Sequence, residues 1–201
     1  MFDALQEAEY GQMQPWIERV EGLQARLISG WLSALLAPKS VIDIGCGPGI
    51  YLLPFKAQGA SVYGIDGCKE AGSRLEPGEF GLVDLRILTA IGMLPTYDLA
   101  ICLEVIEHID KEYEDHLIDL ICSCSDTLLI SWAVPGQGGF QHVNEQTHDY
   151  VLEVFAKRGY TLHPHHQAMR EFLDGFREEQ EREEVCGWLL NNAFLLKREG
   201  I

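Results

Sequence analysis

A glycine-rich segment, Asp43-Ile44-Gly45-Cys46-Gly47-Pro48-Gly49, is the first set of residues in the sequence that could bind a ligand. It lies between an apolar strand-like run and a helical stretch, where open α/β sheets bind their ligands. Glycine lets the backbone turn sharply and approach a ligand closely. The spacing is G-x-G-x-G, whereas a dinucleotide fingerprint needs G-x-G-x-x-G and a P-loop needs a following Lys-Ser/Thr. A tight turn without a ligand is the alternative.

The acid that begins this segment, Asp43, argues against a pyrophosphate ligand. A carboxylate there would repel phosphate and would attract a cation, such as the methionyl amine of S-adenosylmethionine (SAM). Asp66 ends the next strand-like run and could accept hydrogen bonds from two ribose hydroxyls. Asp84 ends the third run and could accept from an adenine amine, with Leu85 packing on the ring. In this order the acids would follow an adenosine along one edge of the sheet.

A second set of residues could bind a metal ion or move a proton. Glu104, Glu107 and His108 follow the fourth strand-like run, and on a helical turn they would share one face. Two carboxylates and an imidazole suit a divalent cation. His142 could be a fourth ligand, because the segment Phe140–Glu145 follows the fifth run and a glycine-rich loop at the same edge.

Two alternatives to a metal site remain open from these residues. The glutamates could cap the next helix while the histidines pack near a substrate. Alternatively, His142 or His108 could act as a general base without a metal, since a neutral imidazole accepts a proton near pH 7. We favour His142 as that base, because a loop after the fifth strand can reach an acceptor.

The elements that would position these residues alternate between strands and helices, which predicts βαβ crossovers and a parallel sheet. Apolar spacing predicts one or two helices over Gln12–Leu36. Further helices are expected at Ile50–Gln58, Lys111–Ser123 and Gln146–Arg158, and a charged helix at Gln167–Glu184. The expected strands are Val41–Ile44, Ser61–Asp66, one within Gly78–Asp84, Tyr97–Leu103, Asp126–Trp132, Tyr160–His163 and Asn192–Lys197.

Together these motifs resemble class I SAM-dependent methyltransferases over residues 38–135. Asp43–Gly49 is similar to their first motif, Asp66 to their ribose acid, Asp84 to their adenine contact, and Tyr97–Ile109 to their fourth-strand segment. The resemblance implies SAM as cofactor and a Rossmann-like, doubly wound α/β sheet of seven strands. That sheet would be mostly parallel, with helices on both faces and an antiparallel last strand inserted beside the sixth. The cofactor contacts implied are Asp43, Gly45, Cys46, Gly47, Gly49, Asp66, Gly67, Asp84, Leu85, Leu103 and Glu104.

The Glu-x-x-Glu-His element with a later histidine resembles metal-assisted O-methyltransferases, which include ubiquinone-pathway enzymes and small-RNA 2′-O-methyltransferases. It implies Mg²⁺ or Mn²⁺ at Glu104, Glu107, His108 and His142. We therefore expect methyl transfer to a hydroxyl of a small molecule such as a sugar or phenol. The alternatives are N- or carboxyl-methylation, methylation of an RNA end, and a non-catalytic SAM-binding module that regulates a partner.

Composition limits the partners. A net charge of −16 disfavours binding to nucleic acid. We expect no membrane span and no signal peptide, and six scattered cysteines indicate a reducing cytoplasm. The oligomeric state is left open.

We expect one domain, with a helical lid at 1–37, a SAM-binding core at 38–135 and an acceptor side at 136–201. Tyr10 or Trp16 could cover the pocket, although core packing is the favoured role for Tyr10, Trp16 and Trp31. We expect core packing for Trp188 with Phe194, and a solvated loop for His163-Pro164-His165-His166.

Overall fold

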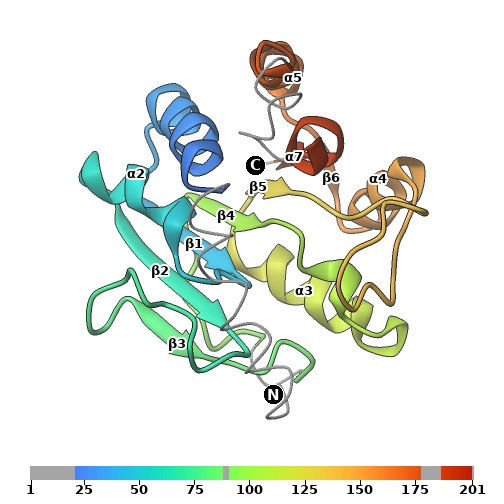
Figure 1. Ribbon diagram of the computed structural model, residues 1–201, viewed down its shortest axis with the longest axis horizontal. Coiled ribbons are helices and arrows are strands. Elements are labelled where there is room, and N and C mark those ends of the chain that lie inside the picture. The colour runs from blue at the N-terminus through green and yellow to red at the C-terminus, as the bar shows by residue number, and fades with distance from the viewer. Residues whose placement is uncertain (1–20, 88–90, 178–186, 201) are drawn as a thin grey trace.

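The computed structural model describes residues 21–87, 91–177 and 187–200. Its centre is a seven-stranded sheet with the order β3-β2-β1-β4-β5-β7-β6 (Figure 1). The strands are β1 Ser40–Ile44, β2 Ser61–Asp66, β3 Phe80–Leu82, β4 Leu99–Cys102, β5 Thr127–Ile130, β6 Tyr160–Leu162 and β7 Phe194–Arg198.

Strand direction in the sheet is as expected from the resemblance. Strands β1 to β5 pair in parallel, so their carboxyl ends meet at one edge. Strand β7 lies between β5 and β6 and is antiparallel to both. The seven-stranded α/β fold predicted from the sequence is therefore confirmed.

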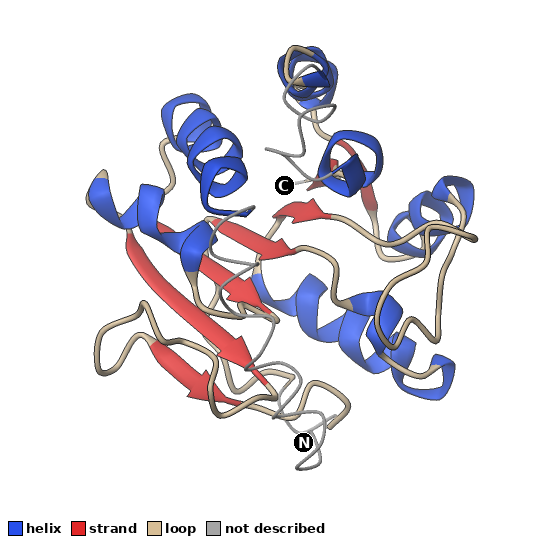
Figure 2. Ribbon diagram, viewed as in Figure 1, coloured by secondary structure: helices blue, strands red, loops and turns tan. Residues whose placement is uncertain are grey.

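Helices cover both faces of the sheet (Figure 2). Successive side chains of β4 alternate between the two cores, with Leu99 and Ile101 on one face and Ala100 and Cys102 on the other. The first face packs against the helical residues 21–36, α2 Leu53–Ala57, α5 His166–Asp174 and α7 Gly187–Asn192. The second packs against α3 Glu114–Cys124 and α4 His148–Ala156. Short 3-10 helices are η1 Ile50–Leu52, η3 Ile106–His108 and η4 Lys111–Tyr113.

Three helical elements differ from expectation. The helix expected over Ile50–Gln58 is divided into η1 and α2, and the helix expected over Lys111–Ser123 is divided into η4 and α3. Helix α7 was not predicted, because its apolar residues Leu189 and Leu190 occupy too short a run for a helical period to be recognised. Both leucines are buried in the core of the first face, so packing against the sheet stabilises α7.

Some expectations concern residues outside the described part of the chain. Tyr10, Trp16 and most of the expected lid belong to this group, as does the end of the helix expected to reach Glu184. Trp31 is described and stacks on Phe172 with ring centroids 5.2 Å apart, so it packs between helices as expected. Within the described residues, no helix has both the length and the apolar character needed to cross a bilayer.

We predict opposite effects on stability for two glycine-to-alanine substitutions. Gly45 has a φ of +77°, and a Cβ there would lie 2.4 Å from Cγ2 of Val105. Gly45→Ala should lower the free energy of unfolding by about 1–3 kcal/mol. Gly30 lies in the helical residues 21–36 with nothing near its Cβ position, so Gly30→Ala should raise it by up to about 1 kcal/mol. Urea unfolding measures both, and equal midpoints would contradict the prediction.

Candidate active site

A cavity of about 690 Å³ opens at the carboxyl edge of the parallel strands. Its lining comes from the ends of β1 and β2, from the segments after β1 to β4 and from residues 137–143 after β5, with Glu21 and Trp188 added from helices. Most residues predicted to contact the cofactor line it, together with both predicted catalytic histidines. These are Asp43, Gly45, Cys46, Gly47, Asp66, Gly67, Asp84, Leu85, Leu103, Glu104, His108 and His142.

The glycine-rich segment is held in place by β2. Asp66 accepts the N–H of Gly47 through Oδ2 at 3.0 Å and the N–H of Cys68 through Oδ1 at 2.8 Å. Gly49 differs from expectation, because it is not among the residues that line the cavity. A Cβ at Gly49 would lie 2.6 Å from Cγ of Leu75, so this glycine permits close packing instead.

One end of the cavity is rich in acids. Asp43 and Asp66 are only 3% and 8% exposed, and burial raises the pKa of both, with the charge of Asp66 as a further cause at Asp43. Glu21, from the helical residues 21–36, was not predicted and also lines the cavity. Burial, followed by the charge of Glu104, raises its pKa to about 8. This end of the cavity would stabilise a positively charged ligand group.

The side chain of Asp84 is already engaged by a neighbour. Arg86 donates to both of its oxygens, at 2.9 and 2.8 Å, and this pairing holds the pKa of Asp84 well below its usual range. Arg86 itself lines the cavity and was not predicted. The signal in the sequence was a basic residue two positions after Asp84, the acid predicted to contact adenine. An adenine amine would therefore have to share the lone pairs of Asp84 with a guanidinium.

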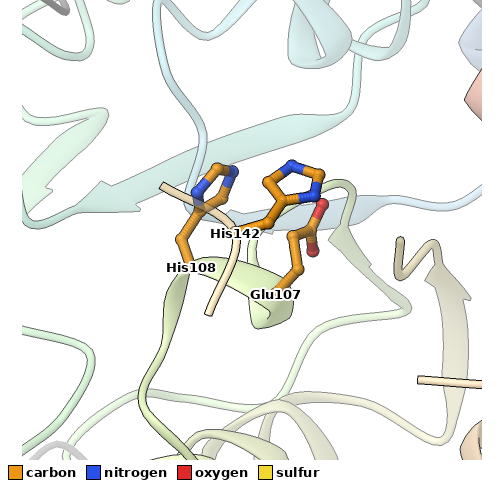
Figure 3. A group of neighbouring side chains, drawn as sticks. All are labelled: Glu107, His108 and His142. Carbon is orange, nitrogen blue, oxygen red and sulfur yellow. The ribbon is translucent and has the colours of Figure 1, made fainter. Parts of the chain in front are cut away.

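Three of the four predicted metal ligands converge, as Figure 3 shows. One ligand atom from each of Glu107, His108 and His142 lies within 4.8 Å of the others. Glu107 is fully buried, and no donor reaches either of its carboxyl oxygens with hydrogen-bonding geometry. Burial, and then the charge of Glu104, raises its pKa to about 9. Burial, followed by His142, lowers the pKa of His108 to about 4, so this imidazole is neutral at physiological pH.

His142 reaches this group through main-chain contacts. The carbonyl oxygen of Glu107 accepts the N–H groups of Val143 and Asn144, at 2.9 and 3.0 Å. These bonds join the segment after β5 to η3, which carries Glu107 and His108. Residues distant in the sequence thus share one site.

Glu104 does not join the converging set, which corrects the expected helical turn over residues 104–108. Its φ is +52°, and its N–H donates to Oγ of Ser131 at 2.8 Å. The left-handed backbone at Glu104 separates it from η3, which begins only at Ile106. Its Oε2 accepts a hydrogen bond from Gln137 at 2.7 Å, while its buried Oε1 has no partner.

Outcomes differ among the other aromatic and histidine residues. Phe194 is buried in the core and Trp188 packs beside it, as expected, and Trp188 also lines the cavity, where it is available to a ligand. His163 is buried, and its Nδ1 accepts the N–H of His165, which indicates a structural role in place of a solvated loop. In the part of the chain that the structure describes, this histidine group does not form a set of potential metal ligands.

Comparison with known sequences identifies a family. A model described as "Methyltransferase domain" matches residues 16–130, more than half of the chain. Over 81 residues, the chain is 43% identical to the ubiquinone biosynthesis O-methyltransferase of Pseudomonas aeruginosa strain LESB58. The corresponding enzyme of Burkholderia cenocepacia is 38% identical over 105 residues. These matches cover 37% and 48% of this chain, and 35% and 43% of the relatives, so the chain spans less than half of their length.

Solved structures share the fold. Magnesium protoporphyrin IX methyltransferase from Synechocystis PCC 6803, with bound SAM, has a TM-score of 0.55 and 26% identity, over 71% of this chain and 70% of that one. The plantazolicin methyltransferase BpumL has a TM-score of 0.64 and 15% identity, over 98% and 92% of the two chains. The cavity at the carboxyl edge, the strand order and the family match agree, and the chain belongs to the methyltransferase domain family as a class I SAM-dependent methyltransferase.

Proposed function

We propose that this chain transfers the methyl group of SAM to a hydroxyl of a small molecule, with a divalent cation at Glu107, His108 and His142. The observation that carries the proposal is the convergence of these three side chains beside the cavity. The O-methyltransferases to which the chain is similar in sequence support the hydroxyl as acceptor.

The donor set fits a divalent cation. A fully buried carboxyl group with two unpartnered oxygens is costly unless a proton or a cation satisfies it. His108 is neutral at physiological pH and can offer a lone pair, as a metal ligand must. One carboxylate and two imidazoles form a mixed oxygen and nitrogen set, for which Mn²⁺ and Mg²⁺ should be compared. Bound there, the cation would lower the pKa of an acceptor hydroxyl and orient it.

The remaining lining residues would hold the cofactor. In this proposal Asp66 accepts from the ribose, Asp84 and Leu85 contact the adenine, and the acids Asp43 and Glu104 face the methionyl end. The loop that carries His142 would then border the transferred methyl group. Without a cation, His142 is the side chain we propose as general base, because His108 is too weak a base to take a proton near pH 7.

The first test measures cofactor binding. Asp66→Ala removes a buried acceptor, so we expect affinity for SAM and S-adenosylhomocysteine to fall roughly 10- to 100-fold, the effect of losing a charged hydrogen bond. Calorimetry measures both ligands, and urea unfolding checks that the variant is folded. Asp119→Ala, at an exposed acid paired with Arg158, is the control and should bind normally. Unchanged binding by Asp66→Ala would remove this residue from the site.

The second test concerns the pH dependence of stability in excess chelator. The pKa of Glu107 is raised from 4.5 to about 9 on folding, so between these values the folded state holds a proton that the unfolded state has lost. This contribution to the free energy of unfolding is complete below pH 4.5 and declines as the pH rises towards 9. Glu107→Gln cannot ionise, so at pH 8 it should be more stable than the wild type by about 1–3 kcal/mol.

Urea unfolding between pH 5 and roughly 9 measures this difference. Glu153→Gln, at an exposed residue paired with Lys157, is the control. A Glu107→Gln variant that is less stable than the wild type at pH 8 would show that the buried carboxyl is satisfied by the protein itself.

The third test concerns the reaction. Methyl transfer from labelled SAM to a panel of phenols, catechols and sugars should require Mn²⁺ or Mg²⁺ and stop in excess chelator. His142→Ala and Glu107→Gln should each lower the rate, by roughly 100-fold or more for a cation-dependent step. Full activity in chelator, with loss only in His142→Ala, would instead support the general-base alternative.

A further inference from the structure

Glu145 makes direct contact with His142, which lines the cavity. Its Oε1 lies 3.0 Å from Nδ1 of His142. The same carboxylate accepts the N–H of Gly136 through Oε2 at 2.7 Å and the N–H of Gly138 through Oε1 at 3.0 Å. One side chain therefore joins the imidazole to the glycine-rich loop that borders the cavity.

The contacts of Glu145 determine which nitrogen of His142 carries the proton. Its two oxygens accept the backbone N–H groups of Gly136 and Gly138, and such bonds favour the ionised carboxylate. An ionised carboxylate only accepts hydrogen bonds. Nδ1 of His142 must therefore donate, and in the neutral imidazole the lone pair is then on Nε2.

Nε2 of His142 lies close to Gly139, at the wall of the cavity. A Cβ built at Gly139 would lie 2.2 Å from this nitrogen, so the imidazole occupies space that only glycine leaves open. Gly139 and His142 both line the cavity, and the side chain of His142 is 10% exposed. The missing side chain at Gly139 thus leaves room for the imidazole of His142, and Glu145 fixes the orientation of the ring.

We propose that Glu145 is a positioning residue that holds His142 as the Nδ1–H tautomer and joins its ring to the 136–138 loop, which leaves Nε2 as the electron-pair donor of the site. The inference rests on the proposed function in one respect, because the use of that lone pair is to bind the cation or accept the acceptor's proton. Hydrogen bonds of this kind, from the far nitrogen of a ligating histidine to a carboxylate, orient the ring and strengthen it as a ligand.

The test reads the tautomer directly, without an acceptor or a metal. Two-dimensional ¹H–¹⁵N spectra of the imidazoles are recorded on the full chain with S-adenosylhomocysteine, at a pH where histidine is neutral. We expect Nδ1–H at His142 in the wild type and a shift towards Nε2–H in Glu145→Ala. Glu145→Gln keeps an acceptor oxygen and should retain Nδ1–H at least in part. Glu153→Ala, at an exposed residue of α4, should leave the signal unchanged.

A purely structural role for Glu145 predicts a different pattern. Glu145→Ala would then speed hydrogen exchange at the amides of Gly136 and Gly138 while His142 kept its tautomer, and that result would overturn the inference. A wild type with the proton on Nε2 would also overturn it. If Glu145→Ala does not fold, the wild-type tautomer and Glu145→Gln still decide the question.

Metal titration separates this inference from the proposed function. We expect Glu145→Ala to bind Mn²⁺ about 10- to 100-fold more weakly than the wild type, as measured by electron paramagnetic resonance. A wild type that shows Nδ1–H but binds no Mn²⁺ would support the role of Glu145 and contradict the metal site. Equal Mn²⁺ affinity in the wild type and Glu145→Ala would contradict the role of Glu145, while the metal site would stand.

Discussion

The pair of hydrogen bonds to the carbonyl oxygen of Glu107 is the contact on which the site depends. Val143 and Asn144 both donate to this oxygen, and they directly follow His142. A buried carbonyl group must find partners, so these bonds are strongly favoured once η3 is formed. They fix the distance between the segment after β4 and the segment after β5, and therefore the distance between Glu107 and His142.

A network of polar residues stabilises the contact between η3 and the segment after β5. The carbonyl of Asn144 accepts a hydrogen bond from the indole of the fully buried Trp132, and its side-chain amide donates to Glu114 at 2.8 Å. Glu114 also pairs with Lys111 and accepts from Tyr150. Because all of these groups except the exposed Lys111 are partly or fully withdrawn from water, breaking one bond leaves others unsatisfied. The network explains how a loop rich in glycine can present a histidine in a defined place.

Acidic groups concentrate at one end of the cavity because three parallel strands end there. Asp43 is the penultimate residue of β1, Asp66 ends β2, and Glu104 follows β4. Their shared location raises the pKa of each by burial, with further contributions from neighbouring charges at Asp43. SAM carries a sulfonium and an ammonium group, and such an environment lowers the free energy of positive charges. The same electrostatics would disfavour a ligand with a pyrophosphate.

Local patterns in the sequence predicted the alternation of strands and helices, and most of the residues that line the cavity near the ends of β1 and β2. The continuous apolar run of β4, the helical spacing in α3 and the glycines after β1 each involve only near neighbours, so short stretches of sequence are enough to predict them. The acceptor side depended on tertiary structure. Only the folded chain shows that His142 meets Glu107, that Glu104 is set apart by its left-handed backbone, and that Glu145 contacts Nδ1. Glu21 and Trp188 likewise reach the cavity from opposite ends of the described chain. These contacts join segments far apart in sequence. Local periodicity does not indicate which of many possible pairs of segments will meet in the folded chain.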